Sequence, residues 1–316
     1  MDMLDTLKGS YFSEVFPKGW DIEKIKKCVS NAPETVFDRQ KFWNKNFQVI
    51  KCTDLEEFGA YMGFEIAMQI KETKEAGRKL ILILPVGPMG MYKWAVYFIK
   101  QLNIDCKHVY GFNMDEWADE NGTTLPASDP AAFTNAMVEA FYGPLGKLTV
   151  PKSQRNFATK ENLPTYPAKM AKLRKEGAKQ VMVYGIGRMC HIAFWEPHFA
   201  DEFKSDKEWL EQPYRIGARL HPFTIEQNAI TSFKSSWPLI PCYANTIGPN
   251  IIFNSDYCIG GADGILSRGM QWQGMSFWMT LRYGPTRFVT SSRIPTMPGK
   301  LFFMDELAGP LCADAN

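Results

Sequence analysis

The glycine-rich stretch from Gly185 to Pro197 holds the residues best suited to acid–base chemistry. It contains His191, one of only 4 histidines in the chain, and Glu196 follows five residues later. An imidazole titrates near neutral pH, and a nearby carboxylate can hold its tautomer. The two residues are therefore a candidate acid–base pair. The structural alternative is a turn with a buried histidine and a glutamate that caps the next element.

Asp115 and Glu116 are a second acidic candidate, at the end of an expected strand. Successive side chains of a strand point to opposite faces, so only one of the two carboxylates is expected in a site. The other should form a salt bridge or a cap. The stretch offers too few ligands for a metal ion, and no metal is expected. Two solvated acids at a strand end are the structural alternative.

Two glycine-containing turns are candidates for ligand binding. The turn Val86-Gly87-Pro88-Met89-Gly90 precedes an expected helix, whose first backbone N–H groups can hold an anion. It lacks the Gly-Lys-Ser/Thr of a triphosphate-binding loop, and Gly185-Ile186-Gly187 lacks the third glycine of a dinucleotide fingerprint. Tight turns that need glycine for backbone reasons would explain the same residues. We expect Cys190 to be a buried, unreactive thiol, because side chains of neighbouring residues diverge.

Alternating strands and helices are expected to position these residues. Apolar runs predict strands, and helical spacing predicts helices, the first of them capped by Thr53. The strands are expected at 47–50, 79–85, 107–112, 180–184, 250–253, 257–259 and 287–290, and the helices at 55–76, 92–102, 130–142, 166–177 and 262–278. This alternation is typical of an α/β fold with a doubly wound, mostly parallel sheet and helices on both faces. The strand-to-helix turns of such a sheet open on one rim, where the candidate residues can meet.

Composition narrows the class of protein. The 316 residues have a formal net charge of +2 and no basic block, which argues against binding to nucleic acid or a membrane surface. The 7 cysteines include no C-x-x-C pair, so free thiols in a reducing compartment are expected. The first residues do not resemble a signal peptide, and no apolar run is long enough to span a membrane. A cytoplasmic protein is therefore predicted.

Residues 1–46 differ from the rest of the chain, because they are rich in aromatic residues but show little regular periodicity. They are too apolar for a disordered tail. We expect an N-terminal extension that packs on the main body or on a neighbouring subunit. Residues 47–316 contain no internal repeat and no low-complexity linker, and are expected to form one α/β domain.

Two stretches carry a resemblance to a known family. Phe112-Asn113-Met114-Asp115-Glu116-Trp117 is similar to a Phe-Asn-Met-Asp-Glu-Tyr segment, and 185–197 is similar to Gly-Val-Gly-x-Asp-Gly-His-Ile-Ala-Phe-Asn-Glu-Pro. Both segments are typical of glucosamine-6-phosphate deaminases, which the chain resembles over about 47–263 and more weakly beyond. The related 6-phosphogluconolactonases share the fold and the Gly-x-Gly…His element.

The resemblance implies an enzyme that opens a sugar ring, moves a proton between C2 and C1 and releases ammonia, without a metal or organic cofactor. It implies that Asp115 is the proton-transferring base, that His191 assists ring opening and that Glu196 orients His191. A carboxylate can move a proton alpha to a carbonyl or imine, so the residue types suit these roles. The resemblance also implies a homo-oligomer that binds a sugar or sugar phosphate. Lactone hydrolysis stays open.

Several positions depart from the family pattern. Met189 replaces an aspartate two residues before the histidine, and a thioether cannot accept the imidazole proton as a carboxylate does. Cys190 and Trp195 replace a glycine and an asparagine. The turn at 86–90 falls where the family has its phosphate-binding loop, but it lacks the hydroxyl groups of that loop. In addition, Pro88 has no N–H to donate. Asp263 falls near the family's phosphate-binding lysine, where an acid would repel a phosphate.

The remaining substrate contacts are carried over from the resemblance and from the first turn. Arg219 matches a family arginine, and His221 falls where the family has a lysine. The residues expected to bind substrate are Gly87, Met89, Gly90, Glu116, Arg188, Arg219 and His221. Together these features predict a sugar or sugar-phosphate isomerase or deaminase. A non-catalytic sugar-binding or regulatory relative and a lactonase-like hydrolase are the alternatives.

Overall fold

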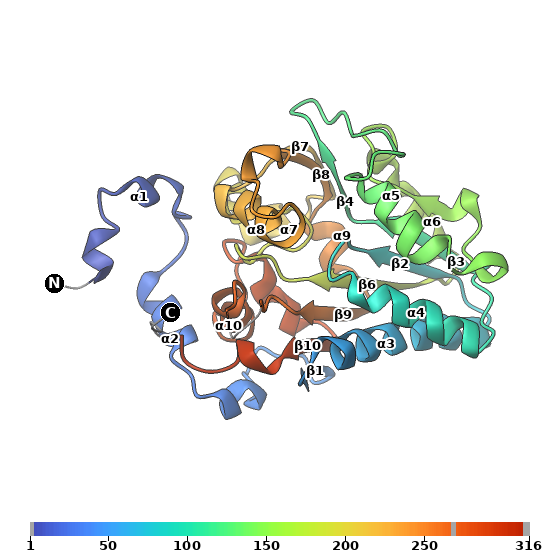
Figure 1. Cartoon of the computed structure of the whole chain (residues 1–316), viewed down its shortest axis with the longest axis horizontal. Coiled ribbons are helices and arrows are strands. Elements are labelled where there is room, and N and C mark those ends of the chain that lie inside the picture. The colour runs from blue at the N-terminus through green and yellow to red at the C-terminus, as the bar shows by residue number, and fades with distance from the viewer. Residues whose placement is uncertain (1–2, 267–269, 312–316) are drawn as a thin grey trace.

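Seven parallel strands form the central sheet of the computed structural model, which describes residues 3–266 and 270–311 (Figure 1). Their order across the sheet is β1-β10-β9-β6-β2-β3-β5. They are β1 (Phe47–Cys52), β2 (Leu80–Leu84), β3 (Val109–Asn113), β5 (Arg155–Asn156), β6 (Lys179–Gly185), β9 (Tyr257–Ala262) and β10 (Gly299–Met304). Every residue of β2 is buried, as expected for a parallel strand covered on both faces. The predicted doubly wound α/β fold is confirmed.

Two long helices, α3 (Leu55–Glu75) and α4 (Gly90–Gln101), pack side by side against one face of the sheet (Figure 1). The cap of α3 is Asp54 rather than the predicted Thr53, because the Asp54 carboxylate accepts a hydrogen bond from the N–H of Glu57 at 2.8 Å. From β5 the chain runs back across the sheet through β6 and β9 to β10, opposite to its course from β1 to β3. Because the crossovers are right-handed, this reversal places the connecting helices on the other face: α6 (Tyr166–Lys175), α9 (Pro249–Phe253) and α10 (Gly274–Arg282).

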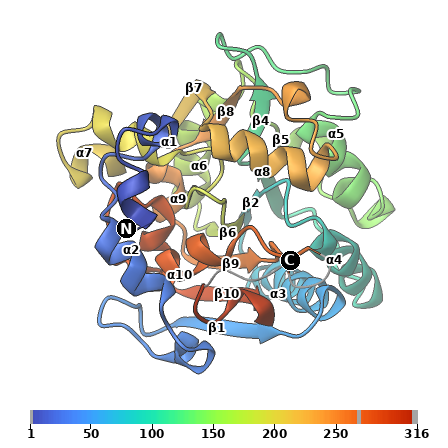
Figure 2. The same ribbon diagram turned by 60° about the vertical axis from the view of Figure 1, so that its left-hand side comes forward.

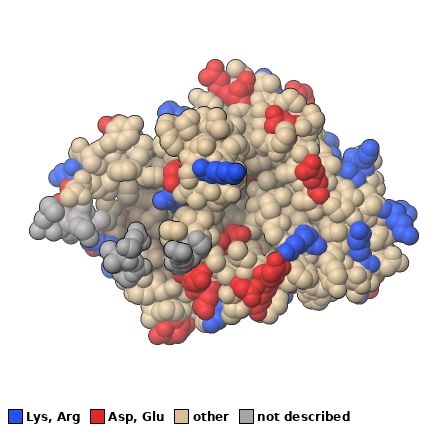
Figure 3. All heavy atoms as spheres, in the orientation of Figure 1, with Lys and Arg blue, Asp and Glu red and all other residues tan. Residues whose placement is uncertain are grey.

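A three-stranded antiparallel sheet follows β3 in the chain, and its strands lie side by side in Figure 2. Its order is β4 (Asp115–Ala118), β8 (Tyr243–Ile247) and β7 (Tyr214–Arg219). Met114 joins the two sheets: its N–H donates to the Leu84 carbonyl at 3.0 Å, and its carbonyl accepts from Ile247 at 2.8 Å. After β7, helix α8 (Pro222–Ser232) lies over the central strands (Figure 2). The molecular surface is hollowed near the centre of the view in Figure 3.

Three predicted elements are wrong. Residues 250–253 form the short helix α9, not a strand, because Pro249 occupies its first position and starts a helical turn. The helix predicted for 262–278 begins only at Gly274, since Ala262 still belongs to β9 and residues 267–269 lie outside the described chain. The last central strand is β10, whereas the strand predicted at 287–290 forms a turn that leads into a 3-10 helix beginning at Thr290.

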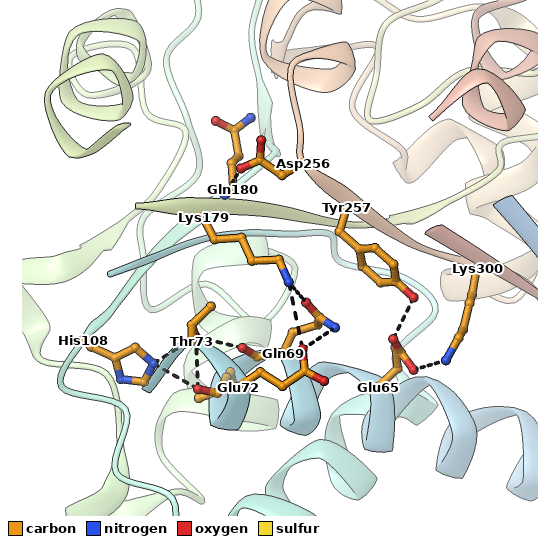
Figure 4. Close-up of polar contacts among 11 residues, drawn as sticks. Glu65, Gln69, Glu72, Thr73, His108, Lys179, Gln180, Asp256, Tyr257 and Lys300 are labelled. Carbon is orange, nitrogen blue, oxygen red and sulfur yellow. Dashed lines mark hydrogen bonds and ion pairs between the residues drawn. The ribbon is translucent and has the colours of Figure 1, made fainter. Parts of the chain in front are cut away.

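A polar network fastens α3 to the amino ends of the central strands (Figure 4). The carboxylate of Glu65 accepts hydrogen bonds from the hydroxyl of Tyr257 at 2.8 Å and from the ammonium of Lys300 at 2.6 Å. Nearby, Lys179 donates to the amide oxygen of Gln69 at 2.6 Å. Glu65 is buried, and these partners offset the cost of removing its charge from water.

The N-terminal segment lies against α10 and the loop that follows it. Its helix α2 (Ile22–Val29) packs on α10. The indole N–H of Trp20 donates to the Phe288 carbonyl at 2.8 Å, and that of Trp43 donates to the Leu281 carbonyl at 3.1 Å. Contact with a neighbouring subunit stays a prediction. Within the described residues, no helix has the length and apolar character needed to cross a membrane.

Candidate active site

A cavity of about 620 Å³ opens at the carboxyl ends of the central strands. It is lined by the turns that follow β2, β3 and β6, by Asp263 after β9, and by residues of α8. Open α/β sheets place their ligands at this rim. The cavity contains both Asp115 and His191, so it is the candidate active site.

The turn from Gly187 to His191 presents an imidazole to this cavity. It is closed by hydrogen bonds from the Gly187 N–H to the His191 carbonyl at 3.0 Å and from the Cys190 N–H to the Gly187 carbonyl at 2.9 Å. Nδ1 of His191 lies 3.2 Å from the hydroxyl of Thr224 and 3.5 Å from a carboxylate oxygen of Glu196. A Cβ at position 187 would collide with the ring near Nε2, so the turn requires glycine here. With Nδ1 engaged, Nε2 is left for a ligand.

Glu196 lies behind His191 and has no exposed surface. Its other oxygen accepts a hydrogen bond from the backbone N–H of His221 at 3.1 Å. Burial raises the pKa of Glu196, but the neighbouring His191 and Thr224 outweigh burial and leave the pKa below its ordinary value. An ionised Glu196 favours a proton on Nδ1 of His191. Glu196 does not line the cavity, so it can influence a ligand only through His191.

Asp115 is the first residue of β4 and lines the same cavity. Only 6% of its surface is exposed, and no described residue donates a hydrogen bond to its carboxyl group. Burial raises the pKa of Asp115 well above its ordinary value, and the charge of Glu116 raises it further. A carboxyl group whose pKa is raised in this way can exchange protons closer to neutral pH.

Glu116 points away from the cavity and supports the start of α5 (Phe133–Met137). Its carboxylate accepts hydrogen bonds from the N–H groups of Phe133 at 2.8 Å and Thr134 at 2.7 Å, and from the Thr134 hydroxyl at 2.9 Å. The structure therefore gives Glu116 a capping role and does not place it in the described cavity lining. It agrees with strand alternation, which placed only one of the two acids in a site.

The other expected substrate contacts divide into two groups. Gly87 and Met89 line the cavity, whereas Gly90, Arg188, Arg219 and His221 do not. The guanidinium of Arg188 pairs with Glu226, and Arg219 is exposed at the end of β7. His221 donates from Nε2 to the Val15 carbonyl at 2.7 Å, which ties the N-terminal segment to α8. These four residues have structural roles or face solvent.

Solved structures share this arrangement of strands and helices. A monomeric glucosamine-6-phosphate deaminase of the NagB superfamily matches with a TM-score of 0.65 and 20% identity, over 82% of this chain and 98% of that chain. The chain has the NagB fold. The 6-phosphogluconolactonase of Trypanosoma cruzi matches with a TM-score of 0.59 and 15% identity, over 82% of this chain and 95% of that chain. The 6-phosphogluconolactonase of Trypanosoma brucei matches with a TM-score of 0.54 and 15% identity, over 84% of this chain and 98% of that chain.

No protein-family model matches the sequence. The predicted resemblance is therefore confirmed at the level of the NagB fold, through similar structures rather than a sequence profile. At sequence identities this low, a shared fold does not establish a shared reaction, so the function must be argued from the site itself.

Within the NagB fold, this chain places Met189 and Cys190 away from the cavity. The side chain of Met189 packs in the hydrophobic core, and Cys190 is fully buried with a left-handed φ of 58°. Burial raises the pKa of the Cys190 thiol, so a thiolate nucleophile is disfavoured there. Thr224 and Glu196 are the groups that engage Nδ1 of His191.

Two sets of cavity residues were missed by sequence reasoning. One is a polar face of α8 formed by Gln227, Asn228 and Thr231, whose spacing brings them together on a helix. The signal was Pro222, which marks the start of this helix. The other is a wall of three aromatic rings, in which Trp117 lies 4.9 Å from both Phe133 and Phe194 between ring centroids. Its members are far apart in sequence.

The cavity has no metal-binding character in the part of the chain that is described. No group of three or more His, Cys, Asp or Glu side chains could hold an ion there. The described lining residues also include no Lys or Arg. What remains is a polar and aromatic cavity with one oriented histidine and two aspartates.

Proposed function

We propose that this protein is a sugar isomerase or deaminase that works by acid–base catalysis in the cavity. The observation that carries the proposal is the joint placement of an unpaired, buried Asp115 and a His191 whose Nδ1 is held by Thr224 and Glu196. The similarity to a structure named as a glucosamine-6-phosphate deaminase supports the same reaction class.

In the proposed reaction, His191 assists proton transfer at the ring oxygen as the C1–O bond breaks and the sugar opens. Asp115 then removes the proton from C2 and delivers a proton to C1. With a hydroxyl on C2, the aldose becomes a ketose. With an amino group on C2, the product is a C2 imine, which takes up water and yields the ketose and ammonia. Glu196 and Thr224 orient His191 and do not contact the sugar.

A non-catalytic sugar-binding protein is the second candidate. Met189 favours it, because this side chain lies in the core and no carboxylate replaces the one that the resemblance leads us to expect. A lactonase-like hydrolase has support from the similar 6-phosphogluconolactonase structures. In that reaction His191 would activate a water molecule, and no ammonia would form.

The test is to measure ammonia and ketose together, from glucosamine and from glucosamine 6-phosphate. We expect equal amounts of the two products, and none with Asp115→Asn. Sugar binding without turnover would point to the non-catalytic candidate. Hydrolysis of 6-phosphogluconolactone without ammonia release from either amino sugar would point to the hydrolase. A homo-oligomer and a cytoplasmic location stay predictions.

A further inference from the structure

The charged residues in the described lining of the cavity have the opposite sign to those that a phosphate group needs. Two of its described lining residues, Asp115 and Asp263, are acids, and none is a lysine or arginine. Two described basic residues adjoin lining residues in the sequence, and neither belongs to the lining itself. Arg188 follows the lining residue Gly187 but pairs with Glu226, and Lys234 is exposed outside the cavity.

Asp263 is held in a fixed place rather than on a free loop. Gln273, which is buried, donates to the Ile186 carbonyl at 2.5 Å and accepts from the N–H of Gly264 at 2.7 Å. This side chain ties the residue after Asp263 to the turn that carries His191. Gln273 and Asp263 both line the cavity. The acid is therefore part of the built site.

Asp263 and Asp115 lie toward opposite sides of the cavity. Asp263 follows β9 and Asp115 follows β3, and the sheet order β9-β6-β2-β3 puts two strands between them. The turn with His191 follows β6 and lies between the two acids. A sugar with its C1–C2 end near Asp115 and His191 would direct its other end toward Asp263.

One feature of the cavity favours an anion: the positive end of a helix. Its charge can be compared with the negative charge of the two acids. Helix α4 begins beside the lining residue Met89, and a helix N-terminus carries about half a positive charge. Pro88, in the same turn, has no N–H to donate. Burial raises the pKa of Asp263 to about 6, so this acid still carries nearly a full negative charge at pH 8. The carboxylate outweighs the helix end.

The rest of the lining suits an uncharged sugar. Gln227, Asn228 and Thr231 offer amide and hydroxyl groups that can bond sugar hydroxyls. The ring of Trp117 and its neighbours offers a flat apolar wall. A mostly apolar cavity with a few directed polar groups is typical of sites for small neutral molecules.

We propose that the cavity binds an unphosphorylated sugar, and that Asp263 selects it by accepting a hydrogen bond from a hydroxyl group at the end of the sugar distant from Asp115. This inference rests on the proposed function for the identity of the ligand as a sugar. A 6-phosphate would bring its negative charges against Asp263, with no described cation in the lining to balance them.

The test is calorimetric binding of glucose, glucosamine and glucosamine 6-phosphate at pH 8 to the full-length protein. We expect glucosamine to bind about tenfold or more tightly than its 6-phosphate. Asp263→Asn should reduce this ratio, and Asp263→Lys should reverse it. The matched control is Asp201→Lys, which makes the same change in net charge at an exposed residue outside the cavity and should leave the ratio unchanged. The comparison of glucose with glucosamine shows what the C2 substituent, at the other end of the sugar from Asp263, adds to binding.

Three outcomes would overturn the inference: tighter binding of the 6-phosphate to the wild type, a ratio unaffected by both Asp263 variants, or no binding of any of the three sugars at about 10 mM. Binding is measured separately from turnover, so the two proposals fail differently. Preference for glucosamine without turnover would refute the reaction alone. Turnover with tight binding of the 6-phosphate would refute the choice of substrate alone.

Discussion

Two buried acids at opposite edges of the strand ends, one beside the amino ends and one beside the carboxyl ends of the central sheet, have different surroundings. Glu65, at the amino ends, is 8% exposed and receives hydrogen bonds from Tyr257 and Lys300 (Figure 4). Asp115, at the carboxyl ends, is 6% exposed and receives none from the described residues. Removal from water penalises both charges, but only Glu65 has partners that offset the penalty. The comparison is consistent with a structural role for Glu65, and it supports the proposal that Asp115 acts on a ligand.

The largest expected effect separates the two acids by activity. Asp115→Asn should lower kcat about 100- to 10,000-fold, because an amide cannot take up the proton from C2. Glu65→Gln should leave kcat within about twofold, since Glu65 lies outside the cavity. Initial rates of ketose formation from glucosamine provide the measurement. Comparable losses in the two variants would show that the distinction between the acids is wrong.

Glu196 is a third buried acid, and it sharpens the comparison because it is paired yet belongs to the site. Glu196→Gln should lower kcat roughly 10- to 100-fold, since a hydrogen bond to a charged group contributes about 1.5–3 kcal/mol. The loss should fall on kcat more than on KM, because Glu196 acts through His191. Thr224→Val is the matched variant, which removes only a neutral partner of Nδ1 and should cost less. An unchanged pH profile in Glu196→Gln would argue for a purely structural role.

The elements of the fold also differ in how well the sequence predicted them. The apolar run of β2 and the alternation at Asp115 and Glu116 depend on neighbouring residues, and the structure has both as predicted. The run at 250–253 was misassigned because four apolar residues suit a strand or a buried helix equally, and only Pro249 distinguishes them.

The sequence alone could not predict which residues distant in the chain pair with each other. Arg188 was expected in the site, but its pairing with Glu226 follows from the position of α8, which the sequence reading did not include. For the same reason Thr224, which is 33 positions from His191 in the chain, was missed as its partner. Residue types predicted the chemistry, whereas the tertiary fold decided which charges are free.

A smaller effect tests the claim that the network at the amino ends is structural. Glu65→Gln should lower the free energy of unfolding by about 1–2 kcal/mol, because Lys300 loses its charged partner while remaining partly exposed. The matched control is Asp305→Asn, in a pair with Lys51 whose side chains are 47% and 48% exposed. That change should cost about 0.5 kcal/mol or less. Urea unfolding followed by tryptophan fluorescence measures both, and equal losses would remove the structural argument.

The smallest expected effect is on the stability of the Asp115→Asn variant, and it tests whether the fold needs this acid. The pKa of this carboxyl is raised in the folded protein, whereas in the unfolded chain it is about 3.9. Between these two values the unfolded state gives up its proton first, so stability falls as pH rises. Asp115→Asn removes this penalty, so it should raise the free energy of unfolding at pH 8 and change it little at pH 4. Urea unfolding at the two pH values gives the comparison. A variant that loses activity and gains stability at high pH has given up a group that the fold does not need, whereas a variant destabilised at both pH values would place Asp115 with Glu65 among the acids that support the structure.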